Sequence, residues 1–150
     1  MNPVNDTLST TNLNKMTEKT PFLVMDLNDV KLKYQSLKQN LADFEVFYAV
    51  KCNPEQPILE TLKKQGSSFE IASLGELKRL IKIGVDPSKV IYSNPVKPID
   101  HIKKTYKLGV RFFAYDSPEE LEKIAKYAPG SNVYLRVSVS NHGSLINLAN

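Results

Sequence analysis

Phe47-Tyr48-Ala49-Val50-Lys51-Cys52-Asn53-Pro54 is the stretch on which the fold of this chain depends. An apolar run that ends at an Asn-Pro turn signal is typical of a buried strand. The pattern therefore predicts a strand over Phe44–Lys51, with Lys51 at its C-terminal end. Because side chains alternate along a strand, Phe47, Ala49 and Lys51 are expected to share one face.

Lys51 is the first candidate functional residue. At the end of a buried strand it would lose water, which favours the neutral amine, and a neutral amine can form a Schiff base with a carbonyl group. In the alternative interpretation, its stem covers apolar surface while its ammonium group reaches solvent. Judged on chemistry alone, this second arrangement is the commoner one.

Composition narrows the class of protein. The chain has 150 residues, 41% hydrophobic and 24% charged, as in a soluble globular domain. Its net charge of +4 is spread among acidic residues, so no nucleic-acid partner is expected. No apolar run reaches about 18 residues, so no membrane span is expected. A single cysteine, Cys52, excludes an internal disulfide and is compatible with a cytoplasmic location.

From Phe44 onward, strand and helix patterns alternate about every twenty residues, which predicts a parallel sheet with right-handed crossovers. Ser73 and Ser117 each precede a glutamate by three positions and predict capping boxes, which explains Glu76 as a capping residue. The predicted strands are Phe44–Lys51, Ser68–Ala72, Val90–Ser93, Arg111–Tyr115 and Val133–Val139.

The region before Phe44, where the alternation of strands and helices begins, is less regular. Residues 1–20 are polar and predict a flexible N-terminal arm, not a secretory signal. Pro21–Leu27 is a short apolar run that predicts a strand. Asn28 or Asp29 is expected to cap the helix that follows.

Two architectures are compatible with this order. An open doubly wound sheet would be complete at this length. A (β/α)8 barrel of the TIM type needs about 250 residues, so this α/β chain would hold a partial barrel of about five βα units.

Five segments together resemble the ornithine/diaminopimelate/arginine decarboxylase family of pyridoxal-phosphate enzymes, which has an alanine-racemase-type barrel. They lie in the family's order at family-like spacing, over roughly Pro21 to Ser144. Within the family, the YAVKCN sequence is most similar to that of ornithine decarboxylases. The segments are FYAVKCNP (47–54), FEIASLGEL (69–77), VIYSNPVKP (90–98), FAYDSPEEL (113–121) and YLRVSVSNHGS (134–144).

The resemblance implies four site residues. Lys51 would hold pyridoxal phosphate as a Schiff base, and Ala49 would lie against the cofactor. Glu70 would stand beside it at the end of the second barrel strand, and Arg136 would face it from the end of the fifth. From the residues alone, the commoner interpretation is structural: Glu70 as a solvated strand-edge acid and Arg136 as an ion-pair partner within a strand.

The implied reaction is decarboxylation of an amino acid. Ornithine, which gives putrescine for polyamine biosynthesis, is the expected substrate; diaminopimelate, lysine and arginine are alternatives. His101 and His142 have no other typical metal ligands at suitable spacing in the sequence, so no metal is assigned. Cys52 is expected to be a small buried side chain.

The chain is expected to be the N-terminal part of a barrel (21–144) with a divergent tail (145–150). The resemblance implies that three strands, the phosphate loop and a second β domain lie elsewhere, and that members are homodimers. We therefore expect exposed strand edges, low stability, and activity only with a complementing C-terminal chain. Alternatively, the chain is an inactive remnant, or binds cofactor without turnover.

Overall fold

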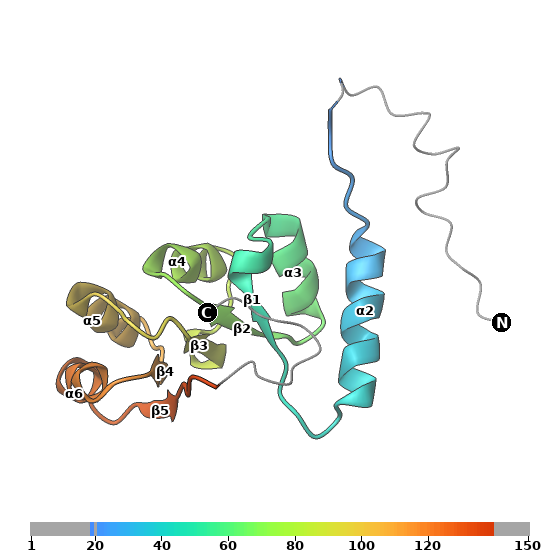
Figure 1. Ribbon diagram of the computed structural model, residues 1–150. Helices are drawn as coiled ribbons and strands as arrows, with labels where there is room; N and C mark the ends of the chain where they lie inside the picture. Colours follow the sequence, from blue (N-terminus) through green and yellow to red (C-terminus); the bar gives the residue numbers. More distant parts are fainter. Residues whose placement is uncertain (1–18, 20, 140–150) are drawn as a thin grey trace.

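The computed structural model describes residue 19 and residues 21–139. The tail at 145–150, His142 and all but residue 19 of the predicted arm lie outside these residues. Strands and helices alternate along the described chain (Figure 1). The helices are α2 (Leu27–Asn40), α3 (Gln56–Lys64), α4 (Leu74–Lys82), α5 (Ile99–Lys107) and α6 (Pro118–Tyr127). The strands are β1 (Phe47–Ala49), β2 (Ser68–Ile71), β3 (Val90–Tyr92), β4 (Phe112–Tyr115) and β5 (Asn132–Leu135), and short 3-10 turns are η1 (Val50–Cys52) and η2 (Pro87–Lys89).

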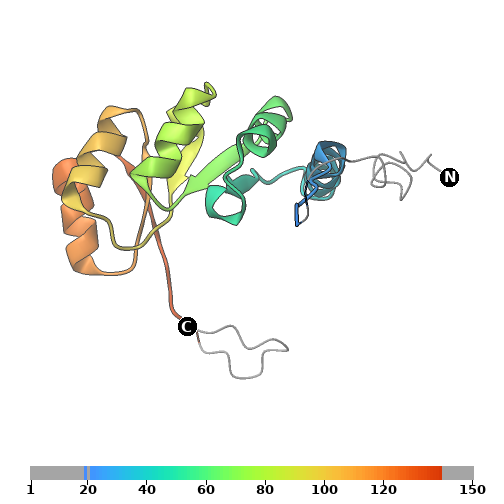
Figure 2. The same cartoon turned by 90° about the horizontal axis from the view of Figure 1, so that it is seen from above.

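The strands form one parallel sheet in the order β1-β2-β3-β4-β5. Seen from above, helices α3 to α6 follow one another in an arc outside the curved sheet (Figure 2). A doubly wound sheet would reverse its strand order and carry helices on both faces. Sequential order with helices on one side is the winding of a (β/α)8 barrel. The partial-barrel prediction is confirmed, and the doubly wound alternative is wrong.

The core lies between the sheet and these helices. Alternate strand residues point outward into it and are buried: Phe69, Ile71, Val90, Tyr92 and Phe113. They meet apolar helix positions that are equally buried: Leu59, Leu77, Leu80, Ile102 and Ile124. Each such side chain contributes about 1.5–3 kcal/mol relative to an exposed one, so this layer stabilises the fold.

Two serine caps begin their helices as predicted. The Ser73 hydroxyl accepts from the Glu76 amide at 3.2 Å, and the Glu76 carboxylate accepts from the Ala72 amide at 2.6 Å. Ser117 likewise accepts from the Glu120 amide at 3.3 Å. The second capping box is nevertheless incomplete, because the Glu120 carboxylate turns away into a buried ion pair with Lys97.

The strand predicted at Pro21–Leu27 is wrong. Residues 21–26 are irregular and mostly exposed, and no described strand lies beside them to pair with their backbone. The predicted helix cap is also displaced. The Asp26 carboxylate accepts from the amides of Asn28 and Asp29, at 2.8 and 3.4 Å, so those two residues lie inside the first turn of α2.

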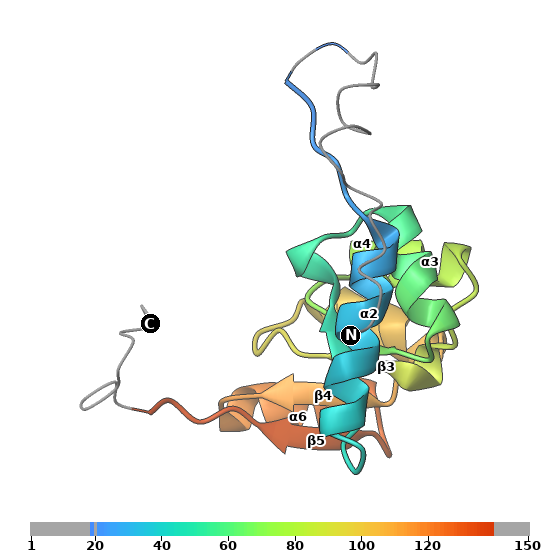
Figure 3. The same ribbon diagram turned by 90° about the vertical axis from the view of Figure 1, so that its right-hand side faces the viewer.

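Helix α2 packs beside α3 at the β1 end of the sheet (Figures 1 and 3). Among the described residues, no helix has the length and apolar character needed to cross a membrane.

The β5 edge exposes apolar side chains. Val133, opposite the buried Phe113 in the sheet register, is 41% exposed. Leu135, Val137 and Val139 continue on alternate positions with exposures of 55%, 69% and 70%. No described helix covers this row, so the β5 end of the helix layer is open, as expected from a partial barrel.

We expect Leu135→Lys to reduce self-association, because charged residues on an edge strand oppose pairing with another chain. Light scattering on warming should fall while the circular dichroism spectrum is kept. Glu119→Lys, on the exposed part of α6, adds the same residue away from the edge and serves as the control. Equal scattering by both variants would contradict this interpretation.

The burial of Tyr92 leads us to expect that the free energy of unfolding changes at alkaline pH. Burial, with the carboxylates of Glu76, Asp100 and Glu120, raises the pKa of Tyr92 to about 12. An unfolded tyrosine ionises near pH 10, whereas the folded one keeps its proton up to about pH 12. Between these two values the unfolded state binds fewer protons than the folded state. The free energy of unfolding therefore falls as the pH rises from about 10 to about 12. Urea unfolding across this range should show a shallower fall for Tyr92→Phe; an equal slope would refute the assignment.

Candidate cofactor site

The functional candidates gather at one edge of the sheet. Lys51 lies in η1 directly after β1, Glu70 lies in β2, Ser93 follows β3, and Arg136 follows β5. Parallel strands place their C-terminal ends on the same side, which is where barrel enzymes carry their active sites. The first two residues are in contact, with the Lys51 Nζ atom 3.7 Å from Glu70 Oε1.

Lys51 differs from its prediction in one respect. Strand β1 ends at Ala49, and the chain turns into η1, where Val50 is buried and Lys51 projects outward. The Lys51 side chain is 62% exposed, so the predicted loss of water is wrong within the described residues. Ala49 and Phe47 share a strand face as expected. Lys51 lies beyond the strand.

Glu70 is held more tightly than Lys51. Its side chain is 26% exposed, and its Oε1 atom accepts a hydrogen bond from the Ser93 hydroxyl at 2.5 Å. The Ser93 amide donates to the Ile71 carbonyl at 3.0 Å, which fixes the serine against β2. Ser93 therefore orients the carboxylate that faces Lys51.

Ser93 and Tyr134 are site residues that sequence reasoning missed. Tyr134 is half-buried on β5, and its pKa is raised by burial and by the charge of Glu70. Arg136 and a hydrogen bond with Ser93 oppose that rise. The phenol thus stays neutral at neutral pH. For Ser93 the available signal was its place at a strand end, one position before Asn-Pro.

Arg136 and Ala49 occupy the edges of the site. The Arg136 amide donates to the Tyr115 carbonyl at 2.8 Å, and the residue is exposed. The predicted strand to Val139 is too long, because β5 ends at Leu135, opposite the last residue of β4. Ala49 lies in register with Glu70, directly opposite it across the β1–β2 pair.

Three other residues complete the comparison with the sequence. Cys52 is exposed, not buried, because η1 carries it to the surface beside Lys51. Glu76 caps α4 as predicted. His101 lies 3.4 Å from the Tyr92 hydroxyl. The described part of the chain contains no group of three His, Cys, Asp or Glu side chains able to hold a metal ion.

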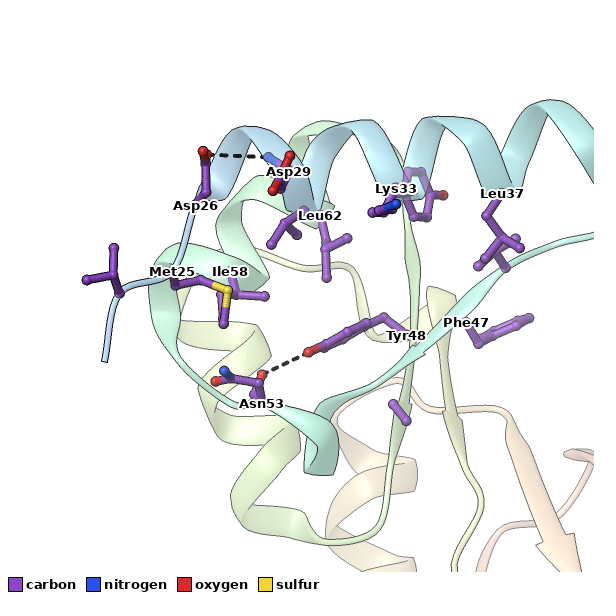
Figure 4. Close-up of a pocket in the computed structure, with 15 residues that line it drawn as sticks. Met25, Asp26, Asp29, Lys33, Leu37, Phe47, Tyr48, Asn53, Ile58 and Leu62 are labelled. Atoms are coloured by element: carbon purple, nitrogen blue, oxygen red, sulfur yellow. Dashed lines mark hydrogen bonds between the residues drawn. The ribbon is translucent and has the colours of Figure 1, made fainter. Parts of the chain in front are cut away.

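A groove of about 640 Å³ lies on the other side of β1, between α2 and α3 (Figure 4). Ala49 lines it together with Tyr48, whose hydroxyl donates to the Asn53 carbonyl at 3.2 Å. Lys51 does not line it. The groove runs along the edge of β1 that has no partner among the described strands, so we interpret it as space beside an unpaired edge.

The chain is similar in sequence to curated amino-acid decarboxylases. It is 43% identical over 129 residues to the lysine/ornithine decarboxylase of Selenomonas ruminantium, covering 86% of this chain and 33% of that protein. It is 40% identical over 120 residues to the chloroplastic ornithine decarboxylase of Nicotiana glauca, covering 80% of this chain and 28% of that protein. The chain thus spans about a third of the length of these relatives.

Solved structures agree with this similarity. Selenomonas ruminantium lysine decarboxylase, solved with pyridoxal phosphate and cadaverine, superposes with a TM-score of 0.84 at 40% identity over 91% of this chain and 36% of that one. Vibrio vulnificus lysine/ornithine decarboxylase, solved with putrescine, gives 0.78 at 28% identity, over 87% of this chain and 35% of that one.

The family model described as "Pyridoxal-dependent decarboxylase, pyridoxal binding domain" matches residues 27–149. This range includes β1 to β5 and the edge that carries Lys51, Glu70 and Arg136. The chain therefore belongs to the pyridoxal-dependent decarboxylase family, and its match lies in the pyridoxal-binding domain of that family.

Proposed function

We propose that this chain supplies the lysine-bearing part of the cofactor site of an amino-acid decarboxylase, with ornithine as its substrate. The observation that carries the proposal is the Lys51 amine, 3.7 Å from the Glu70 carboxylate at the C-terminal edge of barrel strands. The domain spans residues 21–144 in this proposal. A cytoplasmic location stays a prediction.

The residues present fit pyridoxal phosphate. An exposed primary amine can reach an aldehyde, and the carboxylate beside it can balance a positive charge on the nitrogen. When bound, this cofactor accepts the electrons left by the departing carbon dioxide.

Each described side chain has a role in this proposal. Lys51 binds the cofactor covalently and, when released, moves protons at its Nζ atom. Glu70 stabilises positive charge beside Lys51, and Ser93 holds the Glu70 carboxylate in place. Arg136 supplies a cation at the same edge for an anionic group of cofactor or substrate.

A diamino acid is favoured as substrate. The diamines cadaverine and putrescine, present in the structures of two relatives, are the decarboxylation products of lysine and ornithine. We place ornithine first among the substrates because the YAVKCN sequence is most similar to that of ornithine decarboxylases. Lysine is the second candidate. Diaminopimelate and arginine remain as less favoured alternatives.

Binding without turnover is the second candidate, and the exposure of Lys51 favours it. Catalytic electrostatics are strongest where water is excluded, whereas the Lys51 side chain is 62% exposed in the described residues. Turnover is therefore expected only when further βα units, on this polypeptide or on a second one, close the barrel over the site. Whether the assembled protein is a homodimer is likewise a prediction.

We expect pyridoxal phosphate to attach to Lys51. Borohydride reduction of the mixture, followed by peptide mass spectrometry, should find the adduct there, and Lys51→Ala should lose it together with its visible absorbance. Lys64→Ala removes another exposed lysine, at the opposite end of the strands, and should keep both signals. Equal labelling of all surface lysines would show that pyridoxal phosphate has no specific binding site at Lys51.

Completing the barrel should create activity. The chain would be mixed with Selenomonas ruminantium lysine/ornithine decarboxylase that lacks its matched N-terminal third. Carbon dioxide should be released from ornithine, and the Lys51→Ala chain should give none. A mixture that binds cofactor at Lys51 without releasing carbon dioxide would favour binding without turnover.

A further inference from the structure

Lys97 is a buried charged residue that the proposed chemistry does not use. Its side chain is 0% exposed, and its ammonium group lies 2.8 Å from the Glu120 carboxylate, whose side chain is 3% exposed. Removing two charges from water is costly and is tolerated only where both are paired and hydrogen-bonded. This cost suggests that the pair has a role beyond filling the core.

The other contacts of Lys97 show what it connects. Its ammonium group donates to three carbonyl groups, those of Asn94 at 3.0 Å, Pro95 at 3.3 Å and Ala114 at 2.6 Å. Its own amide donates to the Glu120 carboxylate at 3.2 Å. Lys97 thus ties the loop after β3 to the end of β4 and to the first turn of α6.

The tied loop begins at Ser93, the residue that orients Glu70. Contacts therefore run without a break from Lys97, through the loop backbone and the Ser93 hydroxyl, to the Glu70 carboxylate and the Lys51 amine. The loop lies at the C-terminal edge of the sheet, and the Ser93 hydroxyl is held from two sides, by this loop and by the bond from the Ser93 amide to the Ile71 carbonyl.

We propose that Lys97, paired with Glu120, is a positioning residue of the cofactor site that acts through Ser93 on Glu70. The inference rests on the proposed function of Lys51. Without the ammonium group, the three carbonyl groups lose their donor and the loop relaxes. Ser93 then leaves the Glu70 carboxylate, which no longer faces Lys51 in a fixed orientation.

The test separates positioning from folding by removing both charges. Lys97→Met/Glu120→Leu replaces the ion pair with apolar side chains of similar size, which avoids leaving one buried charge unpaired. Lys123, the other partner of Glu120, is 23% exposed and can turn to solvent. The control is Lys104→Met/Asp100→Leu, which removes a surface pair 2.9 Å apart.

Two readouts are measured on the full chain. Hydrogen exchange should show roughly tenfold faster exchange of the Ser93 amide in the double variant, with strand amides of β2 unchanged. The affinity of pyridoxal phosphate for Lys51 should fall about tenfold, the loss expected for one hydrogen bond to a charged group. The control pair should change neither.

Ser93→Ala keeps the proposal testable if the double variant does not fold. It removes only the hydroxyl, and its loss of affinity should match that of Glu70→Gln. Unchanged affinity in Ser93→Ala, or slow Ser93 exchange in a folded double variant, would overturn the positioning role while the proposed function stands. An unaltered chain that forms no adduct at Lys51 would overturn the proposed function and this inference together.

Discussion

Packing of one face of the parallel sheet against helices is the constraint on which the structure depends. Phe69 and Ile71 are fully buried against that layer, so the residue between them, Glu70, must face the barrel interior. A slip of one residue would expose both apolar side chains and bury the carboxylate among the helices. Apolar packing, which has no chemical role of its own, therefore determines where the charged groups of the site lie.

Polar contacts then set the finer geometry. The strand register brings Ala49 and Glu70 side by side, yet the orientation of the carboxylate depends on Ser93, which lies on a loop. Loops are held less firmly than strands because less apolar surface is buried under them. A buried ion pair beneath this loop supplies the rigidity that apolar packing does not.

Three features of the molecule share one physical origin. Lys51 is largely exposed, a groove runs beside the unpaired edge of β1, and an apolar row is exposed at β5. In each case a sheet of five strands with one helix layer lacks the neighbours that a closed barrel of eight strands would provide. In the proposed function, the described residues contribute Lys51 and Glu70 to the site, and closure of the barrel would exclude water from it.

The sequence by itself determined the order of strands and helices, the serine caps and the break in the chain just after Lys51, because alternating hydrophobicity and turn residues are local signals. It did not show that Pro21–Leu27 is irregular, since a strand exists only where a neighbour pairs with it. Only the tertiary structure decided the winding of the sheet, the exposure of Lys51 and Cys52, and the contacts that join Lys97 to Ser93. These features depend on which segments meet in space. The local sequence around one residue does not indicate which distant residue it will contact.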